Sequence, residues 1–584
     1  MDRGILPSEH ELPLRPADFA TLSEALDYAA RGSTGLSFYD SRGRLKEALP
    51  YRDLRRRARS TARRLVGLGL SRGDRVAVIA ENGPEFAVVF FACQYAGFVP
   101  VALPISLNLG SRSAYVEKLR DLLRASQPGL AAAPPDLMPF LEDAAEELPW
   151  LAVESTGALE ALPEPGVVLR ATEPEEAAYI QFTSGSTRFP RGVVITQSAA
   201  MSNLRGIVKD GLRVRPGDRC VSWLPFYHDM GLVGFLLGPT VSQLSVDFLR
   251  TRDFALRPVQ WLKLISRNGG TIAFSPPIGY WLCPRRLRDD DMKDLDLSTW
   301  RVAGIGAEMI RLDLLERFAQ SLEASNFDRR AFLPCYGLAE STLAVSFADL
   351  DEAPLVECVD SDLLAEEGTA VPAGPATKRV NEIVNCGRIL PEHEVVIRDD
   401  DGNPLGRRKV GRVTLRGPSL MEEYHDDPVA TQEVLDADGW LDTGDLGFLT
   451  DEGIFITGRR KDLIIINGRN IWPQDLEHVA EQQPDVRVGD ASAFGVMAPD
   501  GMEKAVLVVH CRTADPDERE HLVSSIQSAV YKNFGIQCSV DLVPPNTLPK
   551  TSSGKLSRAE ARRGFLERSG WAQSEVVVEG AGKV

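Results

Sequence analysis

Short apolar runs alternate with polar turns along the first third of the chain. Residues 74–80 (DRVAVIA) have the pattern of a buried strand, and Asn82-Gly83-Pro84 then begins an apolar helix that ends at Gly97. Residues 98–103 (FVPVAL) predict a second strand. A helix with three leucines between 119 and 123 and a strand over 129–134 follow. This strand–helix order predicts an α/β protein with mostly parallel sheets flanked by helices.

The second half of the chain has a different pattern. Residues 394–406 and 412–417 predict two strands joined by an Asp-Asp-Gly-Asn turn, and 453–458 with 462–468 predict a second such pair. Together they indicate an antiparallel, distorted β-barrel subdomain. A small α+β pattern follows Lys461. We therefore expect an N-terminal core over 1–458 and a mobile C-terminal domain over 459–584. The proline-rich, acidic segment 349–385 is expected to be an irregular insertion.

Composition and charge narrow the class of protein. The 584 residues are 43% hydrophobic, which excludes a disordered chain and a disulfide-stapled miniprotein. The 66 lysines and arginines against 83 acidic residues give a net charge of −17, which argues against a nucleic-acid partner. Cations nevertheless gather locally, with net charges of +5 over 180–215, +2 over 455–475 and +4 over 545–568. These segments are candidates for binding small anions.

Targeting signals and cysteine spacing point to the cytoplasm. No apolar run of secretory type follows the first charges, and the eight cysteines contain no CxxC pair. Residues 86–111 carry no charge, but Gly97, Pro100 and Pro104 interrupt them, so we expect no membrane span. The oligomeric state does not follow from the sequence.

A loop rich in hydroxyl groups is the strongest local chemical signal. In YIQFTSGSTRFPRGVVIT (179–196), a strand leads into five small residues and then into a second strand; the five are Thr183, Ser184, Gly185, Ser186 and Thr187. Hydroxyl and backbone N–H donors in such a loop can surround phosphate oxygens. No Walker motif is present. On composition alone, an ordinary turn remains the alternative.

Three further polar positions suggest nucleotide chemistry when taken together. A turn at Tyr336-Gly337 is expected to lead into a helix whose first turn carries Glu340, where a carboxylate could hold Mg²⁺ against phosphates. Asp445 lies between two glycines and could accept the hydroxyls of a ribose. Lys555 follows a glycine in LPKTSSGKLSR (548–558). Taken alone, Glu340 and Asp445 are better explained as ordinary surface and turn residues, and Lys555 can also be a solvated turn residue.

The order and kind of these motifs resemble the adenylate-forming superfamily of acyl-CoA synthetases, luciferases and peptide-synthetase adenylation domains. The resemblance extends from about residue 20 to 565. It implies that Lys555 and Glu340 are catalytic, that Glu340 and Thr187 serve Mg²⁺, and that Lys461 is the hinge of the C-terminal domain. It also implies ATP contacts from the phosphate loop and from Arg188, Gly306, Ala307, Glu308, Tyr336, Gly337, Asp445 and Arg459.

Other features resemble one branch of that superfamily, the fatty acyl-AMP ligases. Arg188 follows the hydroxyl loop, and Arg191 stands where the superfamily usually has lysine. Residues 222–232 (SWLPFYHDMGL), 385–388 (NCGR) and 470–477 (NIWPQDLE) agree with this branch. So does the long stretch between Glu340 and Gly387, where the branch carries an insertion associated with poor use of CoA.

The resemblance implies two steps that need ATP and Mg²⁺. A long-chain fatty carboxylate attacks the α-phosphate to give an acyl-adenylate and pyrophosphate, and the acyl group then passes to the phosphopantetheine thiol of an acyl carrier protein. Lipid, polyketide and lipopeptide pathways use such products. The carboxylate is already ionised at neutral pH, so no general base is needed. The resemblance also implies that His228 is catalytic, at the mouth of an apolar acyl pocket. The candidate pocket residues are Trp223, Phe226, Phe274, Ile278 and Tyr280.

Several alternatives stay open. A fatty acyl-CoA ligase is the nearest, and the insertion and Arg188 oppose it. An amino-acid-activating domain would need an aspartate that residues 273–280 (AFSPPIGY) lack. A catalytically inactive acyl-adenylate binding protein is opposed by the intact Lys555, Glu340 and Asp445. A non-enzymatic acyl carrier would have no need of the phosphate loop.

Overall fold

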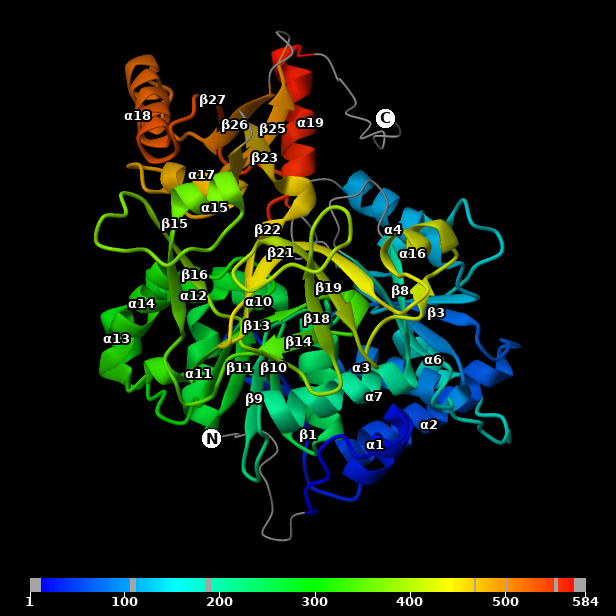
Figure 1. The fold of residues 1–584 in the computed structure, drawn as a ribbon. Helices are drawn as coiled ribbons and strands as arrows, with labels where there is room; N and C mark the ends of the chain where they lie inside the picture. Colours follow the sequence, from blue (N-terminus) through cyan, green and yellow to red (C-terminus); the bar gives the residue numbers. More distant parts are fainter. Residues whose placement is uncertain are drawn as a thin grey trace.

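The computed structural model describes residues 12–105, 112–183, 191–466, 469–498, 503–550 and 555–571. The fold has mostly parallel sheets flanked by helices, a smaller antiparallel sheet, and a C-terminal α+β unit that lies above them in Figure 1. This confirms the predicted α/β class. No helix in the described ranges is long and apolar enough to cross a membrane.

One large sheet carries the strands closest to the candidate site. Its order is β17(Arg388–Ile389), β14(Ala344–Phe347), β13(Phe332–Gly337), β12(Val302–Ile305), β11(Ile272–Ser275), β9(Arg219–Ser222), β10(Ser245–Leu249), β1(Gly35–Tyr39), β2(Leu45–Pro50). The central strands run parallel, and β2, β14 and β17 pair antiparallel at the two ends.

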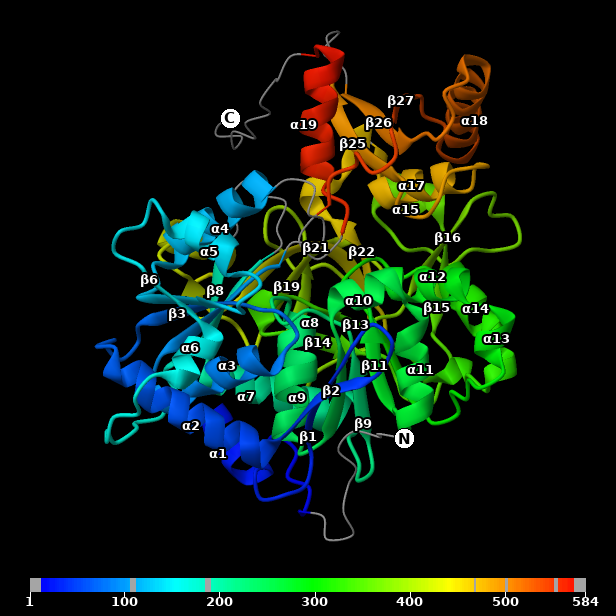
Figure 2. The ribbon, with the colours of Figure 1, turned by 180° about the vertical axis from the view of Figure 1, so that it is seen from behind.

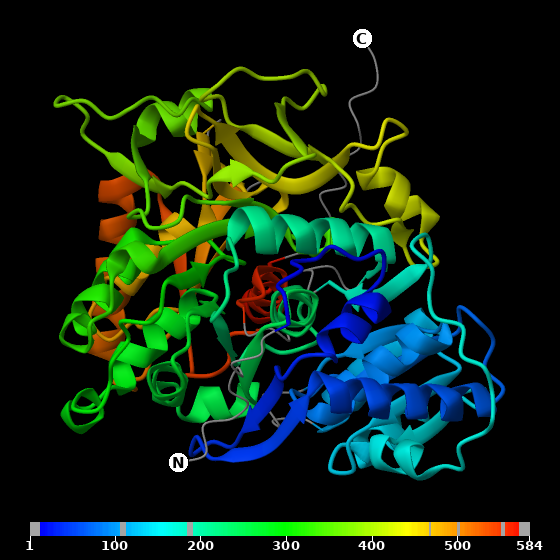
Figure 3. The ribbon, with the colours of Figure 1, turned by 90° about the horizontal axis from the view of Figure 1, so that it is seen from below.

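A second large sheet contains the strands predicted from residues 74–134. Its order is β20(Glu423–Tyr424), β8(Gly192–Thr196), β7(Ala177–Phe182), β4(Val99–Leu103), β3(Arg75–Ile79), β5(Leu130–Ala133), β6(Ala152–Ser155). The pairs β3–β4 and β3–β5 are parallel, as predicted. Seen from below, the blue and cyan part that carries most strands of this sheet lies beside the green part that carries most strands of the first sheet (Figure 3).

The sequence of helix α3(Pro84–Ala96) explains both where the helix begins and ends and why it is buried. Pro84 suits the first turn, and Gly97 ends the helix in the left-handed region at φ 76°. The helix has almost no polar face, and nearly all of its residues are buried. Such an all-apolar helix is stable in water only when other elements surround it.

The remaining helices cover the sheets. On the N-terminal side they are α1(Leu22–Ala29), α2(Tyr51–Gly67), α4(Arg112–Ser126), α5(Met138–Ala145), α6(Thr156–Ala161), α7(Gln197–Arg205), α8(Asp229–Gly231), α9(Gly238–Val241), α10(Thr251–Leu256), α11(Val259–Asn268), α12(Pro277–Arg286), α13(Asp289–Met292), α14(Leu312–Ser321) and α16(Pro428–Val434). Viewed from behind, α4 and α5 lie on one side of the molecule and α11 to α14 on the other (Figure 2).

The antiparallel sheet has the order β18(Glu394–Arg398), β19(Gly411–Arg416), β21(Leu441–Leu449), β22(Ile454–Arg459). The predicted hairpin of β18 with β19 is confirmed. The second predicted pair is wrong, because β22 pairs with β21, and β23(Ile464–Ile466) pairs with β24(Arg469–Ile471). Both predicted strands exist, but each finds a partner elsewhere in the chain.

The segment 349–385 is ordered, contrary to the expectation of irregular structure. It forms the antiparallel pair β15(Val356–Asp360) and β16(Val380–Val384), with α15(Ser361–Glu367) between them. Asp360 caps α15 by accepting hydrogen bonds from two backbone N–H groups of its first turn. Figures 1 and 2 both show α15 beside the C-terminal helix α17(Pro473–Glu481).

The C-terminal unit has its own hydrophobic clusters. Its sheet is β25(Ala491–Met497), β26(Glu503–His510), β27(Cys538–Val543), covered by α17, α18(Pro516–Phe534) and α19(Arg558–Ser569). Two clusters of buried side chains lie entirely within residues 464–566, apart from the main core. A third cluster joins Trp472 to Phe448 and Phe455 and to the apolar side of the 349–385 segment.

Candidate active site

A cavity of about 800 Å³ brings most of the predicted site residues together. Its polar wall includes Thr183, His228, Asp229, Tyr336, Glu340, Asp445, Arg459, Lys461 and Lys555. Its apolar wall includes Ile207, Leu212, Phe235, Ile272, Phe274, Leu343 and Phe347. These residues come from both large sheets, the antiparallel sheet and the C-terminal unit, so the cavity exists only in the folded whole.

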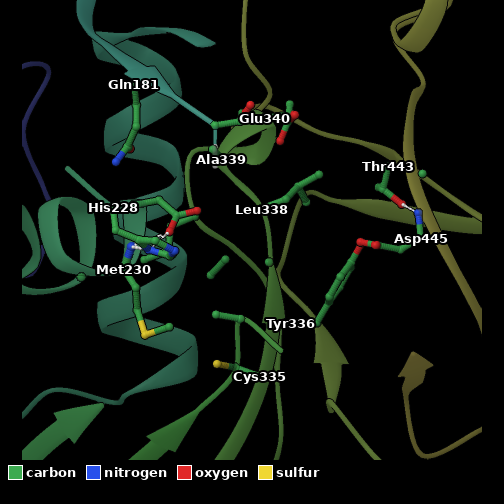
Figure 4. Close-up of a pocket in the computed structure, with 18 of the residues that line it drawn as sticks. Gln181, His228, Met230, Cys335, Tyr336, Leu338, Ala339, Glu340, Thr443 and Asp445 are labelled. Atoms are coloured by element: carbon green, nitrogen blue, oxygen red, sulfur yellow. Dashed lines mark hydrogen bonds and ion pairs between the residues drawn. The ribbon is translucent and has the colours of Figure 1, made fainter. Parts of the chain in front are cut away.

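Asp445 and Tyr336 face each other across one side of the cavity (Figure 4). The Tyr336 hydroxyl donates to Asp445 Oδ2 at 2.7 Å, and Arg459 Nε lies 3.3 Å from Asp445 Oδ1. Asp445 and Arg459 are cross-strand partners in β21 and β22. Burial raises the pKa of Asp445, and the Arg459 guanidinium opposes that rise. An aromatic ring beside a carboxylate suits a nucleoside, which offers a base to stack and ribose hydroxyls to bind.

Glycine is required where β12 and β13 lead into the cavity. A Cβ on Gly306 would lie 2.8 Å from the carbonyl oxygen of Cys335, and one on Gly337 would lie 1.8 Å from that of Leu343. Any larger residue would push these backbones apart and displace Tyr336. The structure also corrects a local prediction, because Tyr336-Gly337 ends strand β13 and is not a turn.

Glu340 lies in a short 3₁₀ turn, η5(Ala339–Ser341), where the sequence predicted an α-helix. The Tyr424 hydroxyl donates to Glu340 Oε1 at 2.7 Å. Burial raises the pKa of Glu340. Arg191 stacks over the Tyr424 ring, with its guanidinium carbon 5.1 Å from the ring centroid. Tyr424 therefore holds both a carboxylate and a cation at the end of the phosphate-loop hairpin.

Lys555 extends from the C-terminal unit to the opposite wall of the cavity. Its Nζ donates to the carbonyl oxygen of Ala307 at 2.7 Å, and Ala307 itself has a left-handed backbone at φ 69°. Burial lowers the pKa of Lys555, although Glu308 and Asp229 oppose that change. Glu308 is exposed beside this turn and is not part of the cavity wall among the described residues.

His228 and Asp229 form a tight polar turn at the start of α8. His228 Nδ1 lies 2.6 Å from Asp229 Oδ1, and the backbone N–H of Met230 donates to the same Asp229 oxygen at 2.7 Å. Burial tends to raise the pKa of Asp229, but His228 and the Met230 amide lower it below its ordinary value. Both side chains line the cavity.

Lys461 lies in η6(Arg460–Asp462), where the chain passes into the C-terminal unit, and it also lines the cavity. Burial and the neighbouring Arg459 lower its pKa. The next residue, Asp462, pairs with Arg558 at 3.0 Å, and Arg558 also pairs with Glu477 at 2.7 Å. The C-terminal unit is thus bound to the residue that follows the expected hinge.

The phosphate-loop prediction falls largely outside the described residues. Ser184, Gly185, Ser186, Thr187 and Arg188 lie there, whereas Thr183 is described and lines the cavity. The Thr183 N–H donates to the carbonyl oxygen of Arg191 at 3.0 Å and closes the hairpin. The β7–β8 hairpin is antiparallel, as the sequence predicted.

The predicted acyl-pocket residues divide into two groups. Phe274 lines the cavity. Trp223 instead stacks on Phe254 at 3.8 Å, Phe226 packs on Phe86 and Phe248, and Tyr280 is fully buried with its hydroxyl donating to Gly304. Ile278 packs against the same core. The four therefore belong to the protein core rather than to the wall of this cavity.

Two π-helical turns supply apolar side chains that the sequence reasoning missed. Ile207 comes from η1(Gly206–Gly211), followed by Leu212, and Phe235 comes from η2(Leu232–Leu237). Tyr424 and Gln181 were also missed. Gln181 does stand in the quoted motif, two residues before Thr183, but Tyr424 has no chemical signature near it in the sequence.

Comparison with known proteins agrees with this geometry. The AMP-binding enzyme family matches residues 36–425. A structure from a study of fatty acyl-adenylate ligases of E. coli and L. pneumophila is 50% identical, with a TM-score of 0.92, and covers 96% of this chain and 100% of that one. The chain therefore belongs to the AMP-binding enzyme family.

Curated relatives extend the comparison. The medium-chain-fatty-acid–[acyl-carrier-protein] ligase JamA of Moorena producens is 31% identical, and the match covers 94% of this chain and 96% of JamA. The long-chain-fatty-acid–AMP ligase FadD26 of Mycobacterium tuberculosis is 30% identical over 93% and 94%. A Caulobacter vibrioides protein, provisionally named an acyl-CoA synthetase, is 44% identical over 96% and 98%. Within its family, the chain belongs to the fatty acyl-AMP ligase branch.

Proposed function

We propose that this enzyme activates a fatty acid with ATP and transfers the acyl group to the phosphopantetheine thiol of an acyl carrier protein. The observation that carries this proposal is one cavity with two unlike walls. The Tyr336–Asp445 pair, Glu340 and Lys555 suit a nucleotide, while Phe235, Phe274 and their neighbours suit a hydrocarbon chain. Both walls meet near His228 and Ala307, where the two reactants would join.

In the first step, an ionised fatty carboxylate attacks the α-phosphate, the new C–O–P linkage forms, and pyrophosphate leaves with the bonding electrons. Negative charge grows on the phosphoryl oxygens during this step. The Lys555 ammonium, brought to Ala307 by its 2.7 Å hydrogen bond, is placed to neutralise that charge. We assign Thr183 to Thr187 and Arg188 to the leaving pyrophosphate, and Gly306, Ala307, Gly337, Asp445 and Arg459 to the nucleoside.

Glu340 fits the expected Mg²⁺. Its carboxylate reaches the cavity, and the Tyr424 hydroxyl fixes its orientation. Proteins commonly hold Mg²⁺ with one or two carboxylates, while substrate phosphates and waters complete the octahedron. We propose that Glu340 and the Thr187 hydroxyl serve this ion, which when bound offsets phosphate charge.

A carrier protein is favoured over free CoA by the contacts of the 349–385 segment. Asp362 and Glu366 pair with Arg469 at 2.9 and 3.3 Å, and Arg379 donates to the carbonyl oxygen of Asn533. These bonds join the segment to the C-terminal unit. We propose that residues 459–584 turn about Lys461 between the two steps and that these contacts limit the turn.

The name of the Caulobacter relative makes a fatty acyl-CoA ligase the second candidate. Incubation with ATP, a long-chain fatty acid and either CoA or holo-carrier protein separates the two. We expect acyl-carrier formation to dominate. Rapid formation of acyl-CoA would overturn the carrier assignment and leave the adenylation step standing.

Isotope exchange between pyrophosphate and ATP tests adenylation itself. Fatty acids of graded length are compared with amino acids, and we expect exchange only with the fatty acids. Exchange driven by amino acids would overturn the acyl assignment. We place the reaction in the cytoplasm, where ATP is supplied and the buried cysteines stay reduced.

A further inference from the structure

Gln181 has an unusual position in the cavity wall. It lies near the end of β7, two residues before Thr183, and its side chain is only 2% exposed. It nevertheless lines the cavity. Neither Nε2 nor Oε1 has a hydrogen-bond partner among the described residues.

An unpaired amide at such a buried position calls for a ligand. Buried polar groups in folded proteins are almost always hydrogen-bonded, because leaving one without a partner is unfavourable. Gln181 leaves both a donor and an acceptor without a protein partner, although apolar residues of the same size exist. The site is therefore built for a molecule that presents an acceptor and a donor side by side.

The face of β7 that carries Gln181 is directed toward the reacting groups. Tyr179 shares that face because side chains alternate along a strand. Burial and the Asp229 carboxylate both raise the pKa of Tyr179, which places the face near the His228–Asp229 turn. Figure 4 shows the Gln181 side chain extending from β7 toward His228. The Lys555 ammonium is also close enough to Asp229 to lower the pKa of that carboxyl.

The reactants of the first step do not satisfy both atoms of Gln181. A fatty carboxylate and phosphate oxygens only accept hydrogen bonds at neutral pH, and the acyl chain does neither. Adenine does present an acceptor and a donor side by side, but we assign the base to the Tyr336 ring and the ribose hydroxyls to Asp445, on the other side of the cavity from Gln181 (Figure 4). The phosphopantetheine arm, in contrast, carries amides, and the first lies two methylene groups from its thiol.

We propose that Gln181 binds the phosphopantetheine arm near its thiol, with Nε2 donating to the carbonyl oxygen of the amide nearest the thiol and Oε1 accepting from the N–H of the next amide along the arm. This inference rests on the function proposed above. In the second step the sulfur attacks the acyl carbonyl carbon, a C–S bond forms, and the C–O bond to phosphate breaks. AMP leaves with the bonding electrons, and the thiol proton passes to solvent. Gln181 holds the arm and takes no part in the bond changes.

The variant Gln181→Met keeps the side-chain size and removes both hydrogen-bonding groups. Its rates of acyl-adenylate formation and of acyl transfer to the thiol are measured separately. Acyl-adenylate formation is followed by pyrophosphate release without thiol, and transfer by mixing preformed acyl-adenylate with holo-carrier protein. We expect transfer to fall about tenfold or more, since two hydrogen bonds are lost. Adenylate formation should change much less. Equal losses in both steps would overturn the proposal.

A thiol series identifies the group that Gln181 contacts. Pantetheine carries the amide, whereas hexane-1-thiol does not. The wild type should prefer pantetheine, and Gln181→Met should lose that preference. An unchanged preference would overturn the proposal. Holo-carrier protein and CoA carry the same arm, so comparing them shows which source supplies it.

Thermal unfolding tests whether Gln181 has only a structural role. The proposal requires the melting temperature of Gln181→Met to equal or exceed that of the wild type, because the substitution removes an unpaired buried amide. A clear fall would show that Gln181 supports the fold and would count against the proposal. If the wild type forms no acyl-adenylate at all, the proposed function fails, and the pyrophosphate assay shows this without any thiol.

Discussion

Lys555 is the residue to which we assign the largest part in the first chemical step. Lys555→Ala should lower the rate of acyl-adenylate formation at least about 100-fold, as when a preorganised charge donor is removed from an active site. ATP binding and the melting temperature should change little. Pyrophosphate release and nucleotide binding measure the two effects. Near-normal adenylation in this variant would contradict the role assigned to Lys555.

The same lysine predicts a pH dependence. Because burial lowers its pKa, Lys555 loses its proton below the ordinary lysine value of 10.5. The charged form is the active one, so adenylation should decline as the pH rises through the lowered pKa. Arginine stays protonated across this range, and the decline should be absent from the residual activity of Lys555→Arg. An identical decline in both would assign it to another group.

Glu340 and Tyr424 allow a graded test of the metal assignment. Tyr424→Phe removes the hydrogen bond that orients the carboxylate and should raise the Mg²⁺ concentration needed for half-maximal adenylation roughly tenfold. Glu340→Gln should have a larger effect in the same direction. Titration of the rate with Mg²⁺ measures both. If the Mg²⁺ requirement stays constant while the maximal rate falls, Glu340 acts in some other way.

For single residues, the sequence predicted the chemical role of a side chain better than it predicted where that side chain lies in the fold. Asp445, Tyr336, Glu340 and Lys555 reach one cavity, because each stands in a motif whose polar group has a specific task. Trp223 does not, since an aromatic residue packs equally well in a core and in a pocket wall. Which of the two occurs depends on the side of the strand it faces and on neighbours distant in sequence.

Among the elements, α17 carries a carboxylate at the junction with the 349–385 segment. Burial and the nearby Glu477 raise the pKa of Asp475 to about 7, and Asn381 Nδ2 donates to its Oδ2 at 3.4 Å. A carboxyl whose pKa is raised on folding binds more protons in the folded state. Its contribution to stability therefore falls as the pH rises from about 4 to 7.

Asp475→Asn should remove this penalty. At pH 8 the variant should be more stable than the wild type by about 1–2 kcal/mol, after discounting the shift for partial exposure to solvent. The difference should shrink toward pH 5. Melting temperatures across this range test it, with the exposed Asp438→Asn as a control. A difference that does not vary with pH would contradict the sign argued here.

Elements with contiguous apolar runs were predictable, and their long-range partners were not. The strands β3, β4 and β5 follow from their composition, because a parallel strand covered on both faces must be apolar throughout. Strands β22 and β23 were recognised but wrongly paired, since sequence neighbours usually pair and here did not. In the 349–385 segment, nearly twenty residues separate β15 from β16. No short-range sequence pattern could therefore predict that these two strands pair.

For the molecule as a whole, the distribution of charge matters more than its total of −17. Carrier proteins and ATP are anionic, and cations gather in the segments that we propose to bind them. The Michaelis constant for holo-carrier protein should therefore rise severalfold between about 50 and 300 mM salt, because screening weakens electrostatic docking. Transfer to the neutral thiol pantetheine should change far less. Equal salt dependence for both would exclude electrostatic docking.

The fluorescence of Trp472 should depend on how the C-terminal unit packs against the 349–385 segment. Trp472 is 5% exposed and packs in one cluster with Phe448, Phe455 and the 349–385 segment, although it follows the hinge at Lys461. A rotation of the C-terminal unit would move the indole away from these rings and into water. Trp472 would therefore report the rotation that we propose between the half-reactions. Its emission should shift to longer wavelength when thiol transfer begins, and Trp472→Phe, measured against the other seven tryptophans, should abolish that shift.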